Sequence, residues 1–166
     1  YKNKKKSNLI ALRHDIDYDI DLALEMAYFE YKSNIKSTYF VLPETNYWNE
    51  KDFLDKCLQL QDYGHEVGLH INIISEWLIN TKEDIKDNLQ RQINFLRKGG
   101  VILNGIAAHG DKLCYENNFS NYWAFQELKP DNPLINENER SAEGPFTKST
   151  RKLIYPKAGK LVRNDG

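Results

Sequence analysis

Residues 8–33 of the chain, NLIALRHDIDYDIDLALEMAYFEYKS, change from one hydrophobic periodicity to another. The apolar run at 8–13 predicts a β-strand, whereas the segment 19–33 predicts an α-helix. Five side chains of that segment recur at helical spacing and are expected to share one buried face: Ile20, Leu24, Ala27, Tyr28 and Tyr31. A strand followed directly by a helix forms one βα unit.

The same alternation recurs up to residue 108. Further strands are predicted at 36–42, 66–70 and 101–108, where β-branched, aromatic or aliphatic residues end at turn signals. A second helix is predicted at 49–63, before Gly64. A third is predicted after the capping-box-like segment 81–84, with a stripe of apolar residues and two terminal glycines: Ile85, Leu89, Ile93, Leu96, Gly99 and Gly100.

Four successive βα units indicate the α/β class, with parallel strands inside and helices outside. A complete (β/α)8 barrel takes about 250 residues, and this chain has 166. We therefore expect an irregular or incomplete (β/α) barrel, forming a single domain over residues 1–166, with truncation at the C-terminus as an open alternative. Residues 111–150 are rich in Asn, Glu, Lys and Pro, apart from an aromatic segment at 122–128, and a further strand is predicted at 152–155.

Composition excludes several classes of protein. The chain carries 23 Lys and Arg against 24 Asp and Glu, for a net charge of −1, so we expect no nucleic-acid partner. No apolar stretch reaches the ~18 residues that a membrane span needs. The two cysteines, Cys57 and Cys114, form no CxxC pair. We expect a cytoplasmic protein, with a removed signal peptide as the alternative.

Acidic and imidazole side chains follow the predicted strands. Asp15 and Asp17 end the first strand, His70 ends the third and His109 ends the fourth. Since ligands of parallel α/β sheets bind at the carboxyl ends of the strands, we expect these groups to meet at one site. Side chains two apart in an extended chain point to the same side, so both carboxylates can face it.

Oxygen and nitrogen donors without thiolate suit Zn²⁺, with Co²⁺, Fe²⁺ or Mn²⁺ as alternatives. Asp17 and His70 are the predicted metal ligands, and His109 is the candidate third ligand. Asp15 would stay free to accept a proton. His14, on the opposite face of the strand, is expected to be a hydrogen-bonded packing residue, and His65 to be structural or solvated. Asp19 and Asp21 are expected to cap the first helix.

Three tryptophans also come after predicted strands. Trp48 follows the second strand, Trp77 the third and Trp123 the fourth. Flat aromatic rings stack on the apolar faces of sugars, which makes these residues candidates for substrate binding. The alternative is that they only cover the mouth of the barrel.

Three segments resemble the motifs of the polysaccharide deacetylases, the NodB-homology fold of carbohydrate esterase family 4. They are residues 13–17 (RHDID), 64–70 (GHEVGLH) and 105–110 (GIAAHG). The resemblance is narrower to the WbmS-like branch, which is linked to surface-polysaccharide gene sets. It implies that Asp15 is the general base, that Asp17 and His70 bind metal, and that the third segment shapes a wall of the groove.

The sequence departs from that family at three places. Ile74 stands where a second metal-binding histidine is common, and Ala107 or Ala108 stands where an arginine holds the base aspartate. Arg13 is the candidate replacement for that arginine and is also a candidate substrate-binding residue. No histidine follows His109, although the family has a late histidine that acts as general acid.

The resemblance implies a metal-dependent hydrolase of carbon–nitrogen bonds that removes an N-acetyl group from an amino sugar of a surface polysaccharide or its precursor. His109 would serve either as third metal ligand or as general acid, because it cannot do both. A non-catalytic carbohydrate-binding or scaffold module is the main alternative, favoured by the three departures. An amidohydrolase of cyclic amides, similar to allantoinase, is the second.

Overall fold

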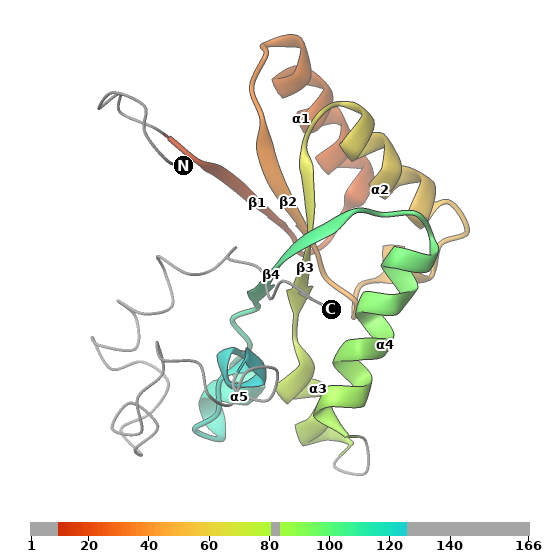
Figure 1. Ribbon diagram of the computed structural model, residues 1–166. Coiled ribbons are helices and arrows are strands. Elements are labelled where there is room, and N and C mark those ends of the chain that lie inside the picture. The colour runs from red at the N-terminus through yellow and green to blue at the C-terminus, as the bar shows by residue number, and fades with distance from the viewer. Residues whose placement is uncertain (1–9, 81–83, 126–166) are drawn as a thin grey trace, which may run out of the picture.

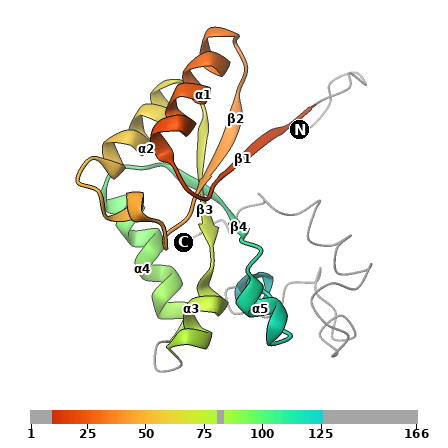
Figure 2. The same ribbon diagram turned by 180° about the vertical axis from the view of Figure 1, so that it is seen from behind.

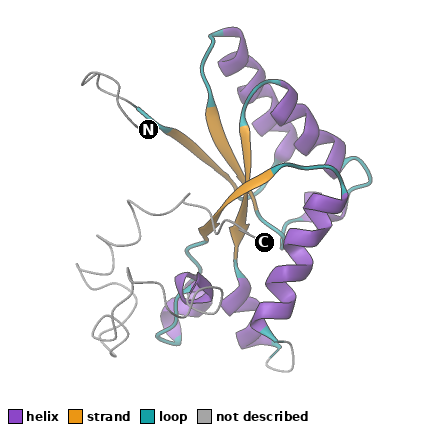
Figure 3. Ribbon diagram, viewed as in Figure 1, coloured by secondary structure: helices purple, strands orange, loops and turns teal. Residues whose placement is uncertain are grey.

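The computed structural model describes residues 10–80 and 84–125. These residues form an α/β fold around one four-stranded sheet (Figure 1, Figure 3). The strands are β1 (Leu12–Ile16), β2 (Ser37–Val41), β3 (Glu66–Ile71) and β4 (Leu103–Ala108). All neighbouring pairs are parallel, in the order β1-β2-β3-β4. The predicted α/β class and the four parallel strands are confirmed, and the predicted strand at 152–155 lies outside the described residues.

The longer helices cover one face of the sheet. Helices α1 (Ile20–Lys32), α2 (Phe53–Asp62) and α4 (Ile85–Lys98) lie along the same side in both views (Figure 1, Figure 2). A sequential strand order with right-handed crossovers places every connecting helix on one side. The short helices α3 (Ile73–Ile79) and α5 (Lys112–Glu116) follow the carboxyl ends of β3 and β4, and the 3₁₀ turns η1 (Asn46–Asn49) and η2 (Asn121–Trp123) complete the order.

The hydrophobic core lies between the sheet and these helices. In the central strands, alternate side chains point to it and are fully buried: Tyr39, Val41, Val67, Leu69 and Ile71. The intervening positions face the other way and include Arg13, Asp15, Phe40, Gly68 and His70. Strand register aligns Asp15 with Phe40 and Phe40 with Gly68. The strands therefore have one apolar face and one face that carries polar chemistry.

The first helix buries a different stripe from the predicted one. Its buried residues are Ile20, Ala23 and Ala27, whereas Tyr28 and Tyr31 are exposed. Both tyrosines pack at the surface against Tyr63, with ring centroids 5.7 and 5.4 Å away. The small alanines let the helix approach the sheet closely, which leaves the large rings at its rim. Asp19 caps the helix as predicted, accepting hydrogen bonds from the amides of residues 21 and 22.

Several predicted boundaries differ from the structure. The first strand begins at Leu12 and extends to Ile16, so it contains Asp15 instead of ending before it. The second helix begins at Phe53 because residues 46–49 form the turn η1. Asp84, and not the start of the segment 81–84, is the N-cap of α4, because its carboxylate accepts from two amides of the first turn. Gly64 and Gly100 adopt the positive φ expected after helices.

Helix α3 has no counterpart in the sequence prediction. Its seven residues, IISEWLI, are apolar on nearly every side and too short to show a helical period. Among the described residues, no helix combines the length and hydropathy needed to cross a bilayer.

Candidate metal centre

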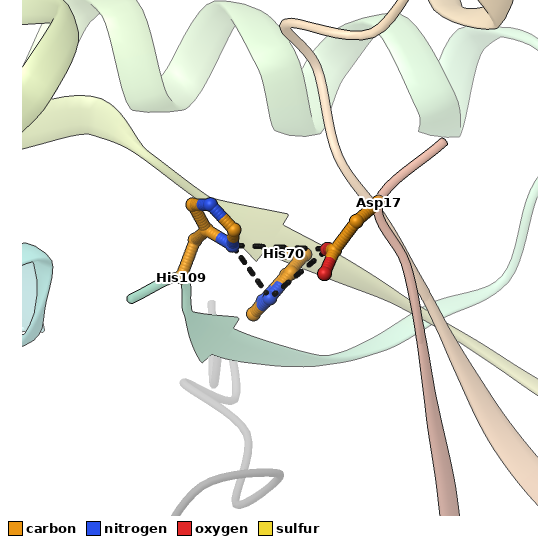
Figure 4. A group of neighbouring side chains, drawn as sticks. All are labelled: Asp17, His70 and His109. Carbon is orange, nitrogen blue, oxygen red and sulfur yellow. Dashed lines mark hydrogen bonds and ion pairs between the residues drawn. The ribbon is translucent and has the colours of Figure 1, made fainter. Parts of the chain in front are cut away.

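Three side chains from different strands meet at the carboxyl edge of the sheet. Asp17 follows β1, His70 lies near the end of β3, and His109 directly follows β4. Figure 4 shows their donor atoms pointing toward one another, and these atoms all lie within 4.8 Å. The convergence predicted from strand ends is confirmed, because parallel strands bring positions remote in sequence to one edge.

The triangle of donors has the size of a metal site. Asp17 Oδ1 lies 3.8 Å from His70 Nε2 and 3.7 Å from His109 Nδ1, and the two nitrogens are 3.1 Å apart. Tetrahedral bonds of about 2.0–2.1 Å would separate the ligand atoms by roughly 3.3 Å. The observed separations bracket that value, so only small side-chain adjustments are needed to hold an ion.

The orientation of His70 suits a metal ligand. The ring is buried, and its Nδ1 lies 3.2 Å from the carbonyl oxygen of Ala107. An Nδ1–H that donates to this carbonyl leaves the Nε2 lone pair facing Asp17 and His109. Metal-binding histidines usually donate their second nitrogen in this way. Burial lowers the pKa of His70, which favours the neutral imidazole that binds a cation.

Asp17 supplies an independent indication of a ligand. Its Oδ1 atom is buried and makes no hydrogen bond. Buried carboxylate oxygens are normally paired, because an unpaired one loses its hydration without compensation. This same oxygen points at the two imidazole nitrogens, so a cation bound there would satisfy it. The donors present therefore fit a divalent ion.

Asp15 lies beside this triangle on the same face. Its Oδ2 atom is 3.6 Å from His70 Nε2, so both carboxylates predicted to face one site do so. Arg13 donates two hydrogen bonds to Asp15, from Nε at 2.7 Å and from an Nη at 2.9 Å. This two-pronged geometry fixes the plane of the carboxylate. Arg13 is therefore the hydrogen-bond partner of Asp15, as the sequence predicts.

Arg13 packs on an aromatic ring of the same sheet face. The Arg13 guanidinium lies over the ring of Phe40, 4.8 Å from its centroid, in a cation–π arrangement. Phe40 in turn lies so close to Gly68 that a Cβ there would overlap the ring. The glycine of the 64–70 segment therefore has a steric role: it lets Phe40 lie flat under Arg13.

The other two histidines lie away from the metal centre. His14 bonds Glu30 through Nε2 at 2.8 Å and packs on Tyr39, which confirms its predicted packing role on the opposite face. His65 is buried, with Nδ1 accepting from the Ser37 amide and Nε2 donating to the Ala27 carbonyl. It is structural as predicted, and the solvated alternative is wrong.

The tryptophans pack against other aromatic rings. Trp48 contacts Phe53 and Phe95, with centroids 4.9 and 5.2 Å away, on the helix side of the sheet. Trp77 and Trp123 each pack edge-on against Phe119, at 5.8 and 5.1 Å. The structure thus places none of the three in contact with the metal triangle, and their role in substrate binding stays a prediction.

A polar network beside the triangle escaped the sequence analysis. Its centre is Asn72, two residues after His70, whose amide donates to Glu44 and, at 2.8 Å, to Asp111. Asn121 joins it from η2. Burial raises the pKa of Glu44 to about 7, and the hydrogen bond from Asn72 opposes this shift. The sequence feature that could have indicated this network is Asp111, because it is a carboxylate two residues after His109, near the end of a predicted strand.

Comparisons with known proteins identify no relative. The chain matches no family model, no curated protein and no solved structure.

Proposed function

We propose that this chain is a metal-dependent deacetylase that hydrolyses an N-acetyl group on an amino sugar of a surface polysaccharide or its precursor. The observation that carries the proposal is the triangle of Asp17, His70 and His109, together with Asp15 held beside it by Arg13. The similarity of the motifs at 13–17, 64–70 and 105–110 to those of polysaccharide deacetylases supports the substrate class.

Asp17, His70 and His109 would hold the ion, which fits Zn²⁺ best by its set of one oxygen and two nitrogens. Three protein ligands leave a position open to the reactants, as catalytic zinc sites require. When bound, such an ion supplies Lewis acidity and lowers the pKa of water at the site. His109 is assigned to the metal because its Nδ1 closes the triangle.

Asp15 is the proposed proton-transfer group. Its carboxylate lies within 4 Å of His70 Nε2 yet is oriented by Arg13, so it is placed beside the ion without completing the triangle. It would accept a proton from the attacking water as the C–O bond forms, and return it to the amine nitrogen as the C–N bond breaks. Acetate and a free amine are the products, and the protons balance with this single carboxylate.

The test combines metal binding with product release. Zinc affinity is measured by titration of the purified chain, and acetate release is measured on N-acetylglucosamine oligomers. We expect Asp15→Asn to bind zinc as the wild type does but to release acetate about 10²–10⁴-fold more slowly. His70→Ala should lose zinc, whereas the matched variant His14→Asn, on the opposite face, should keep both zinc and activity.

Each outcome decides part of the proposal. A wild-type chain that binds no zinc, or a His70→Ala variant with unchanged affinity, would refute the metal centre. Zinc binding without acetate release would instead favour the non-catalytic carbohydrate-binding module. Release of product from cyclic amides but not from N-acetyl sugars would move the substrate to the other amidohydrolase class.

A further inference from the structure

Asn121 makes an unusually complete set of hydrogen bonds. The residue is 1% exposed, so its carboxamide is shielded from water. Its Oδ1 atom accepts from the amide of Ile74 at 2.9 Å and from that of Ser75 at 3.3 Å. Its Nδ2 atom donates to Asn72 Oδ1 at 2.6 Å and to the carbonyl oxygen of His109 at 3.0 Å, with a longer contact to Ser75 Oγ at 3.4 Å. A carboxamide has two donor and two acceptor positions, and all four are used.

These bonds join three segments that are remote in sequence. Asn121 comes from η2, Ile74 and Ser75 begin α3 after β3, and His109 follows β4. The backbone of His109 is held twice, because its amide donates to the Ile71 carbonyl at 2.9 Å and its carbonyl accepts from Asn121. We call the contact of these three segments around Asn121 the Asn121 junction. The separation between the rings of His70 and His109 therefore depends on the Asn121 junction.

The junction has no alternative donor to the His109 carbonyl among the hydrogen bonds of the described residues. Without Asn121, that carbonyl and the Asn72 side chain would each lose a buried partner. Unpaired buried polar groups cost about 1–3 kcal/mol, so the loop after β4 would shift to regain them. A shift of that loop moves His109 Nδ1, which has only its ring torsions to compensate.

We propose that Asn121 is a positioning residue of the metal centre, fixing His109 relative to His70 through its bond to the His109 carbonyl. This inference rests on the proposed function, since it assumes that the triangle holds a metal. Outer partners of metal ligands typically change affinity by 10- to 100-fold when removed. Asn121 differs from such partners in that it acts on the backbone of the ligand and not on its ring.

A substitution can separate this role from the support that Asn121 gives to α3. Asn121→Asp keeps an oxygen to accept from Ile74 and Ser75 but removes the donor to the His109 carbonyl and to Asn72 Oδ1. Asn121→Ala removes both. If Asn121 served only α3, the aspartate variant would bind zinc like the wild type. If it positions His109, both variants should bind zinc 10- to 100-fold more weakly.

The experiment measures the zinc dissociation constant at pH 8 by competition with a chromophoric chelator, and the absorption spectrum of the Co²⁺-loaded chain. Far-UV circular dichroism confirms folding, and Asn121→Ser replaces any variant that does not fold, because its short side chain cannot span the same partners. Asn88→Ala is the matched control, since Asn88 is also buried (3% exposed) but bonds Glu76 and Arg91 instead.

We expect the Asn121 variants to show weakened zinc binding and an altered Co²⁺ spectrum, and the Asn88 variant to show neither. Zinc affinity of Asn121→Asp within twofold of the wild type would overturn this inference and leave the metal centre standing. A wild type without zinc affinity would overturn both. Weakening of the same size in Asn88→Ala would show a general loss of stability and would also overturn the positioning role.

Discussion

Replacing Gly68 by alanine tests how the sheet face that carries Arg13, Asp15 and His70 is built. A Cβ at this position would lie 2.5 Å from Phe40 Cδ1 and 3.1 Å from Cζ, with Cε1 closer still. To reach an ordinary contact of about 3.4 Å, the ring must retreat by about 1 Å. Phe40 is 1% exposed and lies under the Arg13 guanidinium, so this movement would displace neighbouring side chains.

Overpacking of this kind typically costs about 1–3 kcal/mol, and we expect Gly68→Ala to lose about 2–3 kcal/mol of its free energy of unfolding. For a chain of this size, that loss corresponds to a decrease in Tm of roughly 4–12 °C. The assay is urea unfolding followed by far-UV circular dichroism. The ring also supports Arg13, so acetate release should decrease together with stability.

A double-mutant cycle identifies the source of the loss. Phe40→Leu shortens the side chain that collides with the new methyl group. The double variant Phe40→Leu/Gly68→Ala should therefore be more stable than the sum of the single losses predicts, with a coupling energy of about 1 kcal/mol or more. A Gly68→Ala variant within 0.5 kcal/mol of the wild type, a margin of about the size of ordinary surface changes, would refute the reasoning, as would strict additivity in the cycle.

Three further outcomes follow from particular side chains and their contacts. Glu30→Gln should lose about 2 kcal/mol at pH 7, because Glu30 accepts from Ser37, Tyr39 and His14. Burial raises the pKa of Glu30, but these hydrogen bonds together lower it below the ordinary value. The stability difference between wild type and Glu30→Gln should therefore be fully present above pH ~4.5 and disappear as the pH falls further. Urea unfolding at several pH values measures this difference. Both thiols are buried, and burial raises the pKa of Cys57 to about 12. Neither Cys57 nor Cys114 should therefore react with Ellman's reagent at pH 8 without denaturant. Rapid labelling of the folded chain would contradict the buried positions of the thiols. Arg13→Lys should keep zinc but slow acetate release at least tenfold, because one ammonium cannot make both bonds to Asp15; an unchanged rate would show that the second bond is dispensable.

The approach of Asp17, His70 and His109 to one another could be predicted from topology, because parallel strands end at one edge of the sheet. The exact distances between their donor atoms could not, since Asp17 and His109 lie just beyond the strand ends. Asn121 could not be predicted, because its contacts depend on the path of the chain through α5 and η2, which tertiary packing determines. The sequence predicts the first strand too early, because its apolar run lies at residues 8–12 whereas β1 spans Leu12–Ile16. Within β1, the charged side chains of Arg13 and Asp15 share one face of the strand, so the strand lacks a continuous apolar run.

The difference between the two faces of the sheet has a functional meaning. Parallel strands covered on both faces are usually apolar throughout, but here the strands place Arg13, Asp15 and His70 opposite the side that packs on helices. Charged groups on a face that an apolar layer covered would cost more than their mutual contacts recover. Phe40 and His70 on this face are buried, but the side chains of Arg13 and Asp15 stay 33% and 34% exposed, as a site that admits water or a polar ligand requires. The partly exposed charged residues of this face are among those to which we assign the chemistry.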